Sequence, residues 1–257
     1  MPESHVLYEA VDGVAVLTLN HPEKRNALSR EMLSSLKEHL DRIASDASVR
    51  AVIVRANGPV FSAGHDLREL AVDDPEAHAR VFAACAQMML AIHRLPVPVI
   101  ARVQGLATAA GCQLVAQCDL AVASTDASFG VNGIDVGLFC ATPSVPLVRN
   151  VPAKQAMEML LTGEFITADQ ARERGLVNRV ALPGQLDQEV DRLVASILGK
   201  PRVAIAMGKA LFYRQREMGS EAAYQLAGQT MACNMVHEAA QEGVQAFIDK
   251  RKPQWPV

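Results

Sequence analysis

Two glycine-containing turns carry the backbone groups best suited to chemistry in this sequence. Residues 105–111 read GLATAAG, and their small side chains leave the first N–H groups of a following helix uncovered. Residues 61–66 read FSAGHD and again place a glycine turn before a helix start. The positive end of a helix dipole attracts a negatively polarised oxygen. If the turns meet, the backbone N–H groups of His65 and Ala110 can share one oxygen and form an oxyanion hole.

Each turn follows an apolar segment that predicts a strand. Residues 51–55 precede the first turn and residues 97–101 precede the second. A further apolar run at 120–123 follows the second turn and its helix, which gives a strand–turn–helix–strand crossover unit. From residue 201 onward the pattern is almost entirely helical. We therefore expect a core over residues 1–200 and a helical C-terminal region over residues 201–257.

Two helices have clear sequence signals. Ser29 is a good N-cap, and it is followed at helical spacing by Met32, Leu33, Leu36, Leu40 and Ile43. Residues 75–95 predict a long helix that is apolar on nearly all sides in its middle, so we expect it to be buried.

Further motifs accompany the two turns along the chain. They are LTLNHPEKRNAL at 17–28, DVGL at 135–138, MEMLLTG at 157–163, GLV at 175–177 and FIDKRK at 247–252. In this order and spacing they resemble the crotonase superfamily, the enoyl-CoA hydratase/isomerase family, over nearly the whole chain. The resemblance implies an α/β crotonase (ClpP/crotonase-like) fold of repeated ββα units with a helical C-terminal region.

The resemblance also implies a ligand and the residues that hold it. The backbone N–H groups of His65 and Ala110 would bind the thioester carbonyl of an acyl-CoA, which is a substrate, so no separate cofactor and no metal are expected. The implied CoA contacts are Ala63, His65, Asp66, Leu67, Arg68 and Ala110, with phosphate contacts from Lys24, Arg25 or Arg68. The basic run 250–252 is either a further contact, from a neighbouring subunit, or a solvated tail. Family members imply a homotrimer or a dimer of trimers, with residues 201–257 forming the interface and covering the site.

The sequence departs from the family at the positions that move protons. Family hydratases use two glutamates, and the matching positions here are Gln113 and Gly133. A glutamine can orient a water molecule but cannot take its proton, and glycine can do neither. Other members place an acid, base or nucleophile at positions matching Phe139 and Ala141, which also lack such groups. Ordinary hydration is therefore not expected.

Other polar side chains are candidates for proton transfer. The His65 ring titrates in a useful range, and it either acts as a base or only hydrogen-bonds at the surface or to Asp66. Asp135 lies two residues after Gly133, so in an extended segment its side chain would return to the same face. The alternative for Asp135 is a turn or capping role.

Two cysteines could also approach the site from its two loops. Cys112 and Cys140 have no evident basic partner in the sequence, which a nucleophilic cysteine requires. We therefore interpret both as small buried hydrophobic residues.

Three functions remain open at this stage. The first is an unusual hydratase or isomerase, a lyase-type enzyme in which Gln113 orients water and His65 or Asp135 is the base. The second is decarboxylation of a malonyl-type CoA ester, because loss of CO₂ itself generates the enolate that an oxyanion hole stabilises. The third is a protein that binds acyl-CoA without turning it over.

Composition restricts the partners and the compartment. The formal net charge is −3 and aromatic residues make up 4% of the chain, which argues against nucleic acid or an anionic membrane as partner. The five cysteines form no C-x-x-C pair and the histidines show no metal-ligand spacing. The N-terminal residues show neither a secretory nor a transit pattern, so we expect a cytoplasmic protein.

Overall fold

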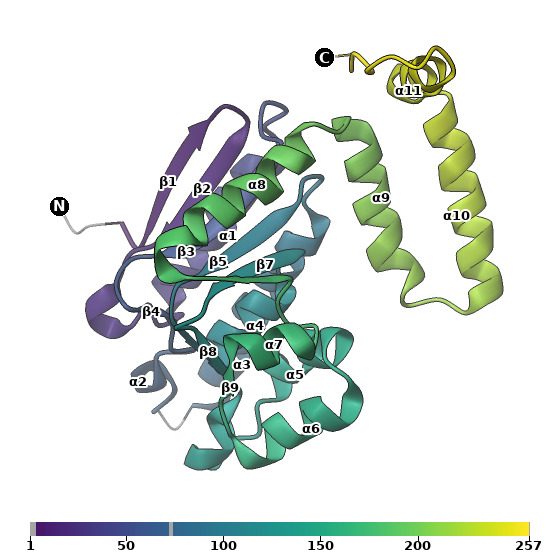
Figure 1. Cartoon of the computed structure of the whole chain (residues 1–257). Helices are drawn as coiled ribbons and strands as arrows, with labels where there is room; N and C mark the ends of the chain where they lie inside the picture. The colour runs from purple at the N-terminus through teal and green to yellow at the C-terminus, as the bar shows by residue number, and fades with distance from the viewer. Residues whose placement is uncertain (1–3, 72–73, 257) are drawn as a thin grey trace.

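The fold is built on two β-sheets with helices packed against them (Figure 1). The structure is a computed structural model that describes residues 4–71 and 74–256. The larger sheet has the strand order β1-β2-β3-β5-β7-β10, and only β1 pairs antiparallel with its neighbour. Its strands are β1 (Val6–Val11), β2 (Val14–Leu19), β3 (Ala51–Ala56), β5 (Val99–Val103), β7 (Leu120–Ser124) and β10 (Arg179–Ala181).

The smaller sheet carries the segments that lead into the two turns. Its order is β4-β6-β8-β9, and its strands are β4 (Val60–Ser62), β6 (Leu106–Thr108), β8 (Ser128–Gly130) and β9 (Ile166–Thr167). Strands β4, β6 and β8 each follow a strand of the larger sheet directly in the chain. Each such pair is followed by a helix, so the predicted repetition of ββα units is confirmed.

Helices cover both faces of the larger sheet. The core helices are α1 (Arg30–Ala44), α2 (Leu67–Leu70), α3 (Pro75–Arg94), α4 (Ala110–Gln117), α5 (Ala141–Asn150), α6 (Ala153–Thr162), α7 (Ala168–Glu173) and α8 (Leu186–Leu198). The side chain of Ser29 accepts a hydrogen bond from the Met32 N–H and the five predicted apolar positions of α1 are buried, as expected. Three 3₁₀ helices complete the core: η1 (Pro22–Lys24), η2 (Asn132–Val136) and η3 (Pro183–Gln185). None of the helices in the described residues combines the length and hydrophobicity that crossing a bilayer requires.

The C-terminal helices extend away from this core (Figure 1). They are α9 (Arg202–Gln215), α10 (Ser220–Met235) and α11 (Glu238–Ile248). Large apolar side chains on and beside them are exposed, including Phe212, Tyr224, Met231, Val236, Phe247 and Ile248. The helical character predicted beyond residue 201 is confirmed, whereas the role of this region stays a prediction.

A buried ion pair attaches α9 to the core. Lys209 Nζ lies 2.6 Å from Asp119 Oδ2 and donates to the carbonyl oxygens of Ile92 and Val97 at 2.8 and 2.9 Å. The Tyr213 hydroxyl donates to the other Asp119 oxygen at 2.7 Å. The side chains of Lys209 and Asp119 are only 7% and 13% exposed. Every proton of the ammonium group therefore has an acceptor, which makes this buried pair tolerable.

His93 next to this ion pair should make stability depend on pH. Its ring stacks on Tyr213 with the centroids 3.7 Å apart, and burial, followed by the Lys209 charge, lowers the pKa of His93 to about 4. The His93 ring therefore binds a proton more tightly in the unfolded chain than in the folded protein. The stability that depends on a neutral ring is complete above about pH 6.5 and is lost as the pH falls toward 4. Between pH 7 and pH 4.5 we expect the free energy of unfolding to fall by about 1–2 kcal/mol less in His93→Phe than in wild type. Partial solvation of the ring keeps the difference this small. Urea unfolding at both pH values measures this difference, and equal losses would contradict it.

Candidate active site

The two glycine turns lie directly against each other. A Cβ atom on Gly64 would lie 2.9 Å from Ala109 Cβ and 3.1 Å from the Ala110 nitrogen. Gly64 also has φ +86°, a conformation that side chains disfavour. The parallel pairing of β4 with β6 brings the turns to this position. Only glycine at residue 64 permits this approach.

Two backbone N–H groups are left without partners where the turns meet. Ala110 is the first residue of α4, and helix N-termini leave such N–H groups unpaired. Neither the His65 N–H nor the Ala110 N–H forms a hydrogen bond to another residue in the described part of the chain. Orphaned backbone donors are rare, so two of them at adjoining turns are suited to bind a ligand oxygen. That they share one oxygen stays a prediction.

The second turn contains a strained alanine. Ala109 has φ 48° and ψ −119°, and its N–H donates to the Gly130 carbonyl oxygen at 2.9 Å. Such a conformation costs a residue with a side chain about 1–3 kcal/mol. The hydrogen bond to β8 fixes the residue that immediately precedes the Ala110 N–H.

Replacing Ala109 by glycine should therefore stabilise the fold. The relief of strain exceeds the entropic cost of glycine, and we expect a net gain of about 1 kcal/mol in the free energy of unfolding. Urea denaturation measures it. Ala210→Gly, on the exposed face of α9, is the matched control and should lose about 1 kcal/mol. A loss of stability in Ala109→Gly comparable to that control would show that the alanine is not strained.

A buried asparagine supports the first turn, and sequence reasoning missed it. Asn26 is fully buried and has φ 50°, and its amide donates to the carbonyl oxygens of Asn57 and Val60, each at 2.8 Å. The Ser62 hydroxyl donates to the Asn26 carbonyl at 2.8 Å. The 17–28 motif thus braces the strand that leads into the turn. An asparagine between a polar loop and an apolar run was the available signal.

The His65 ring lies inside the protein. Nδ1 is 3.3 Å from the Leu28 carbonyl oxygen, the ring meets Phe82 edge to face, and Nε2 is buried without a partner among the described residues. Because a carbonyl only accepts, Nδ1 carries the proton. Burial lowers the pKa of His65, so the ring is neutral at pH 7. Asp66 caps α2 by accepting from the Arg68 N–H, so the ring bonds Leu28 and not Asp66. A role of the ring as base stays a prediction.

The two positions matching the family glutamates differ in the room they offer. Gln113 is 4% exposed on α4, and its Oε1 has no partner among the described residues. A Cβ atom on Gly133 would lie 2.5 Å from the Leu138 carbonyl oxygen and 2.8 Å from Cys140 Sγ. Position 113 therefore holds a buried side chain of the size of glutamine or glutamate, whereas position 133 accepts no side chain without a shift of the loop.

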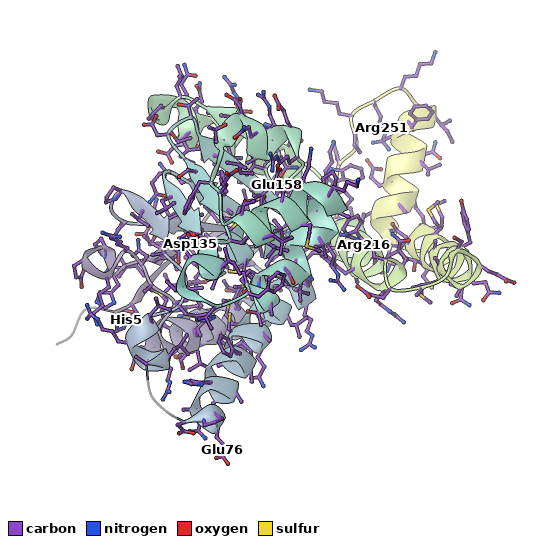
Figure 2. The ribbon with its side chains drawn as sticks, turned by 90° about the horizontal axis from the view of Figure 1, so that it is seen from below. His5, Glu76, Asp135, Glu158, Arg216 and Arg251 are labelled. Atoms are coloured by element: carbon purple, nitrogen blue, oxygen red, sulfur yellow. The ribbon has the colours of Figure 1, made fainter. Side chains whose placement is uncertain are left out.

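Asp135 does not share a face with residue 133, and the expectation that it would is wrong. Residues 132–136 form the 3₁₀ helix η2 instead of an extended segment, and three residues per turn put positions 133 and 135 on different sides. The Asp135 carboxylate is exposed and faces Gly163 at the end of α6 (Figure 2). Among the described residues its carboxylate accepts a hydrogen bond only from Asn132 Nδ2, at 3.5 Å, so a capping or turn role stays a prediction.

The two loop cysteines are buried. Burial raises the pKa of Cys112 to about 12 and also raises the pKa of Cys140. The Gly133 N–H donates to Cys140 Sγ at 3.2 Å. Cys112 therefore packs as a small apolar residue, as expected, while Cys140 has a polar partner.

The implied CoA contacts are divided between two places. The Ala63 N–H donates to the Arg25 carbonyl at 3.0 Å, so η1 with Lys24 adjoins the first turn. Leu67 and Arg68 are exposed on α2 directly after that turn. Arg251 lies far from Asp135 on the C-terminal helices (Figure 2) and pairs with Glu242 at 2.7 Å. The run 250–252 is thus remote from the turns in this chain. In residues 4–71 and 74–256, no group of three His, Cys, Asp or Glu side chains is placed to hold a metal ion.

A sizeable cavity lies elsewhere in the described part of the chain. It measures about 890 Å³ and opens between α3, α5 and α9, where Leu90, Val145, Arg149, Tyr213 and Met218 line it. It touches α4 at Gln117, at the opposite end of that helix from Ala110. It is therefore separate from the two turns.

Comparison with known proteins finds a matching family and similar structures over nearly the whole chain. The family model described as enoyl-CoA hydratase/isomerase matches residues 9–256. The rat protein named enoyl-CoA hydratase domain-containing protein 3, mitochondrial, is 47% identical over 95% of this chain and 82% of its own length. An enoyl-CoA hydratase structure from Mycobacterium smegmatis matches with TM-score 0.97 and 57% identity, over 98% of this chain and 99% of its own. Human enoyl-CoA hydratase domain-containing protein 3 matches with TM-score 0.95 and 46% identity, over 98% of this chain and 100% of its own. The resemblance and the fold predicted from the motifs are confirmed.

The expectation of a cytoplasmic protein is contradicted by this comparison. Four vertebrate relatives that are 45–48% identical to the chain carry names that place them in mitochondria. The expectation relied on free cysteines and on the N-terminal residues. Free cysteines indicate reducing conditions without specifying a compartment.

Proposed function

Because the chain belongs to the enoyl-CoA hydratase/isomerase family, we propose that it binds a CoA thioester and stabilises the enolate of its acyl group. The observation that carries this proposal is the pair of unpartnered N–H groups at His65 and Ala110, on turns in direct contact. Negative charge grows on the thioester oxygen as the enolate forms. Fixed donors that bind this charge typically contribute on the order of 10²–10³ in rate each.

Coenzyme A would approach along the first turn. Lys24 and Arg25 adjoin Ala63, and Arg68 follows on α2, so cations flank the segment on both sides. Exposed cations of this kind bind phosphate groups by charge and hydrogen bonding. The ligand in this proposal is the substrate itself, and no further cofactor is required.

In this proposal the site catalyses hydration only slowly. Gln113 cannot accept a proton, and no carboxylate fits at Gly133. Each missing acid or base group costs about 10²–10⁴ in rate, while the oxyanion hole is retained. Enolate formation, as in isomerisation or proton exchange next to the thioester, remains accessible.

Hydration of crotonyl-CoA tests this distinction. We expect wild type to be slow and Gln113→Glu to gain roughly 10²-fold, because a buried carboxyl of the same size then faces the site. Gly133→Glu is the matched control and should gain nothing, since its Cβ would meet the Leu138 carbonyl at 2.5 Å. Loss of the enoyl absorbance measures hydration. Fast hydration by wild type would contradict the proposal.

Decarboxylation of a malonyl-type CoA ester is the second candidate. Neutral groups at Gln113 and Gly133 would not repel the carboxylate of such an acyl group, whereas two glutamates would. Loss of CO₂ leaves the enolate on the oxyanion hole without any base. A panel of malonyl-type thioesters assayed for CO₂ release tests it, and no release from any ester removes this candidate. Saturable binding without any product would instead indicate a binding protein.

The functional unit in this proposal is an oligomer, a trimer or a dimer of trimers. Exposed Phe212, Tyr224 and Phe247 lie on α9 to α11, and the 890 Å³ cavity adjoins α9. Apolar surface of this extent on one region typically marks a protein interface. Residues 201–257 would form that interface. Sedimentation equilibrium measures the subunit number, and a monomer at micromolar concentration would contradict this part.

A further inference from the structure

A thiol lies where the side chain of the second family glutamate would begin. A Cβ atom on Gly133 would be 2.8 Å from Cys140 Sγ, and the Gly133 N–H donates to the same sulfur at 3.2 Å. The loop closes on itself here, because the Leu138 N–H also donates to the Gly133 carbonyl at 2.9 Å. The sulfur therefore takes up space that would belong to a side chain at residue 133.

The loop with this thiol is fastened to the second turn. The Thr108 hydroxyl donates to Asn132 Oδ1 at 2.6 Å, which ties the residue before Gly133 to the end of β6. The Gly133 N–H, which follows directly, donates to Cys140 Sγ. The sulfur is thus linked through residues 132 and 133 to the strand end that precedes the Ala110 N–H.

A second polar group at this helix turn also lacks a partner. Gln113 is 4% exposed, and its Oε1 has no hydrogen-bond donor among the described residues. A buried acceptor without a donor costs about 1–3 kcal/mol, so we expect a ligand or a water molecule to donate to it. Residue 113 follows Ala110 by three positions and therefore lies on the same side of α4.

We propose that Cys140 exchanges the proton at the α-carbon of the bound thioester, in place of the carboxylate absent at residue 133. This inference rests on the proposed enolate function. In the forward step the S–H bond breaks, a C–H bond forms at the α-carbon of the enolate, and the electron pair stays on sulfur. The thiolate then takes a proton from water. In the reverse step the thiol first gives its proton to water. The thiolate then forms an S–H bond with the α-proton while the C–H bond breaks, and the electron pair of that bond becomes the enolate on the oxyanion hole.

The surroundings of Cys140 suit a proton donor. Burial raises the pKa of its thiol, so the proton is present at neutral pH, while the Gly133 N–H acts in the opposite direction by stabilising the thiolate. Cys140 is also the N-cap of the ten-residue helix α5, whose dipole favours a negative charge at this end.

Deuterium exchange at the α-carbon of butyryl-CoA in D₂O, followed by NMR, tests this role without requiring net turnover. We expect Cys140→Ala to lower the exchange rate about 10²-fold at unchanged butyryl-CoA affinity. Cys112→Ala, the matched buried thiol, should stay within about twofold of wild type, because its sulfur has no such role. Cys140→Asp should retain exchange and move the rising limb of the pH profile to lower pH, since a carboxyl has a lower pKa than a thiol.

The outcomes separate the two proposals. Full exchange in Cys140→Ala, or a pH profile that Cys140→Asp leaves in place, would overturn the role of Cys140 while enolate formation stands. No exchange by wild type that binds butyryl-CoA would overturn the enolate function and this inference with it.

Discussion

Gly111→Ala is expected to abolish the oxyanion hole. Its Cβ would lie 2.8 Å from the Ser62 carbonyl carbon and closer still to the Ser62 carbonyl oxygen. Because these are backbone atoms in β4, the clash is relieved only by separating the two turns. We expect α-proton exchange to fall by on the order of 10²–10³, and the free energy of unfolding to fall by about 1–3 kcal/mol.

The control for this variant is another glycine with free space. A Cβ atom at Gly184 meets no atom within 4 Å, so Gly184→Ala should keep both activity and stability. NMR measures the α-proton exchange rate, and urea unfolding measures the stability. Wild-type exchange in a folded Gly111→Ala protein would show that the contact of the two turns is not needed.

Lys209→Met is expected to have the largest effect on stability. The substitution leaves the Asp119 carboxylate buried with only the Tyr213 hydroxyl and the Val99 N–H as partners. Removing one partner of a buried ion pair costs about 3–5 kcal/mol because the remaining charge stays desolvated. Since Lys209 also donates to carbonyl oxygens at the end of α3 and just before β5, α9 should detach from the core.

An exposed lysine gives the matched control. Lys37 pairs with Asp41 on the surface of α1, where both side chains are well exposed. Lys37→Met should cost less than about 1 kcal/mol in the free energy of unfolding. Urea unfolding of both variants at pH 7 makes the comparison. Equal losses in the two variants would contradict a structural role for the buried pair.

The glycine turns and the strands before them could be predicted because their signals are local, whereas the ββα repetition was implied by the family resemblance. Gly64 and Gly111 are required by close backbone approach, and apolar runs before them indicate strands. The geometry around Asp135 could not be predicted in this way. Gly137 in the left-handed conformation and the Leu138-to-Gly133 hydrogen bond curl the segment into a 3₁₀ helix, and only the packing against α6 selects that outcome.

Contacts between residues far apart in the sequence could not be predicted either. Lys209 and Asp119 are 90 positions apart, and nothing near either residue in the sequence indicates the other. The tautomer of His65 likewise depends on the Leu28 carbonyl, 37 positions away. A residue whose role is set by a distant partner gives no periodic or motif signal.

The most direct measurement is α-proton exchange of butyryl-CoA in D₂O, made beside crotonyl-CoA hydration on the same preparation of the wild-type protein. An intact oxyanion hole without the two glutamates predicts exchange above the solution background, together with hydration at least about 10²-fold slower than that exchange. Saturable binding of butyryl-CoA with no exchange would contradict enolate stabilisation as the function of this site.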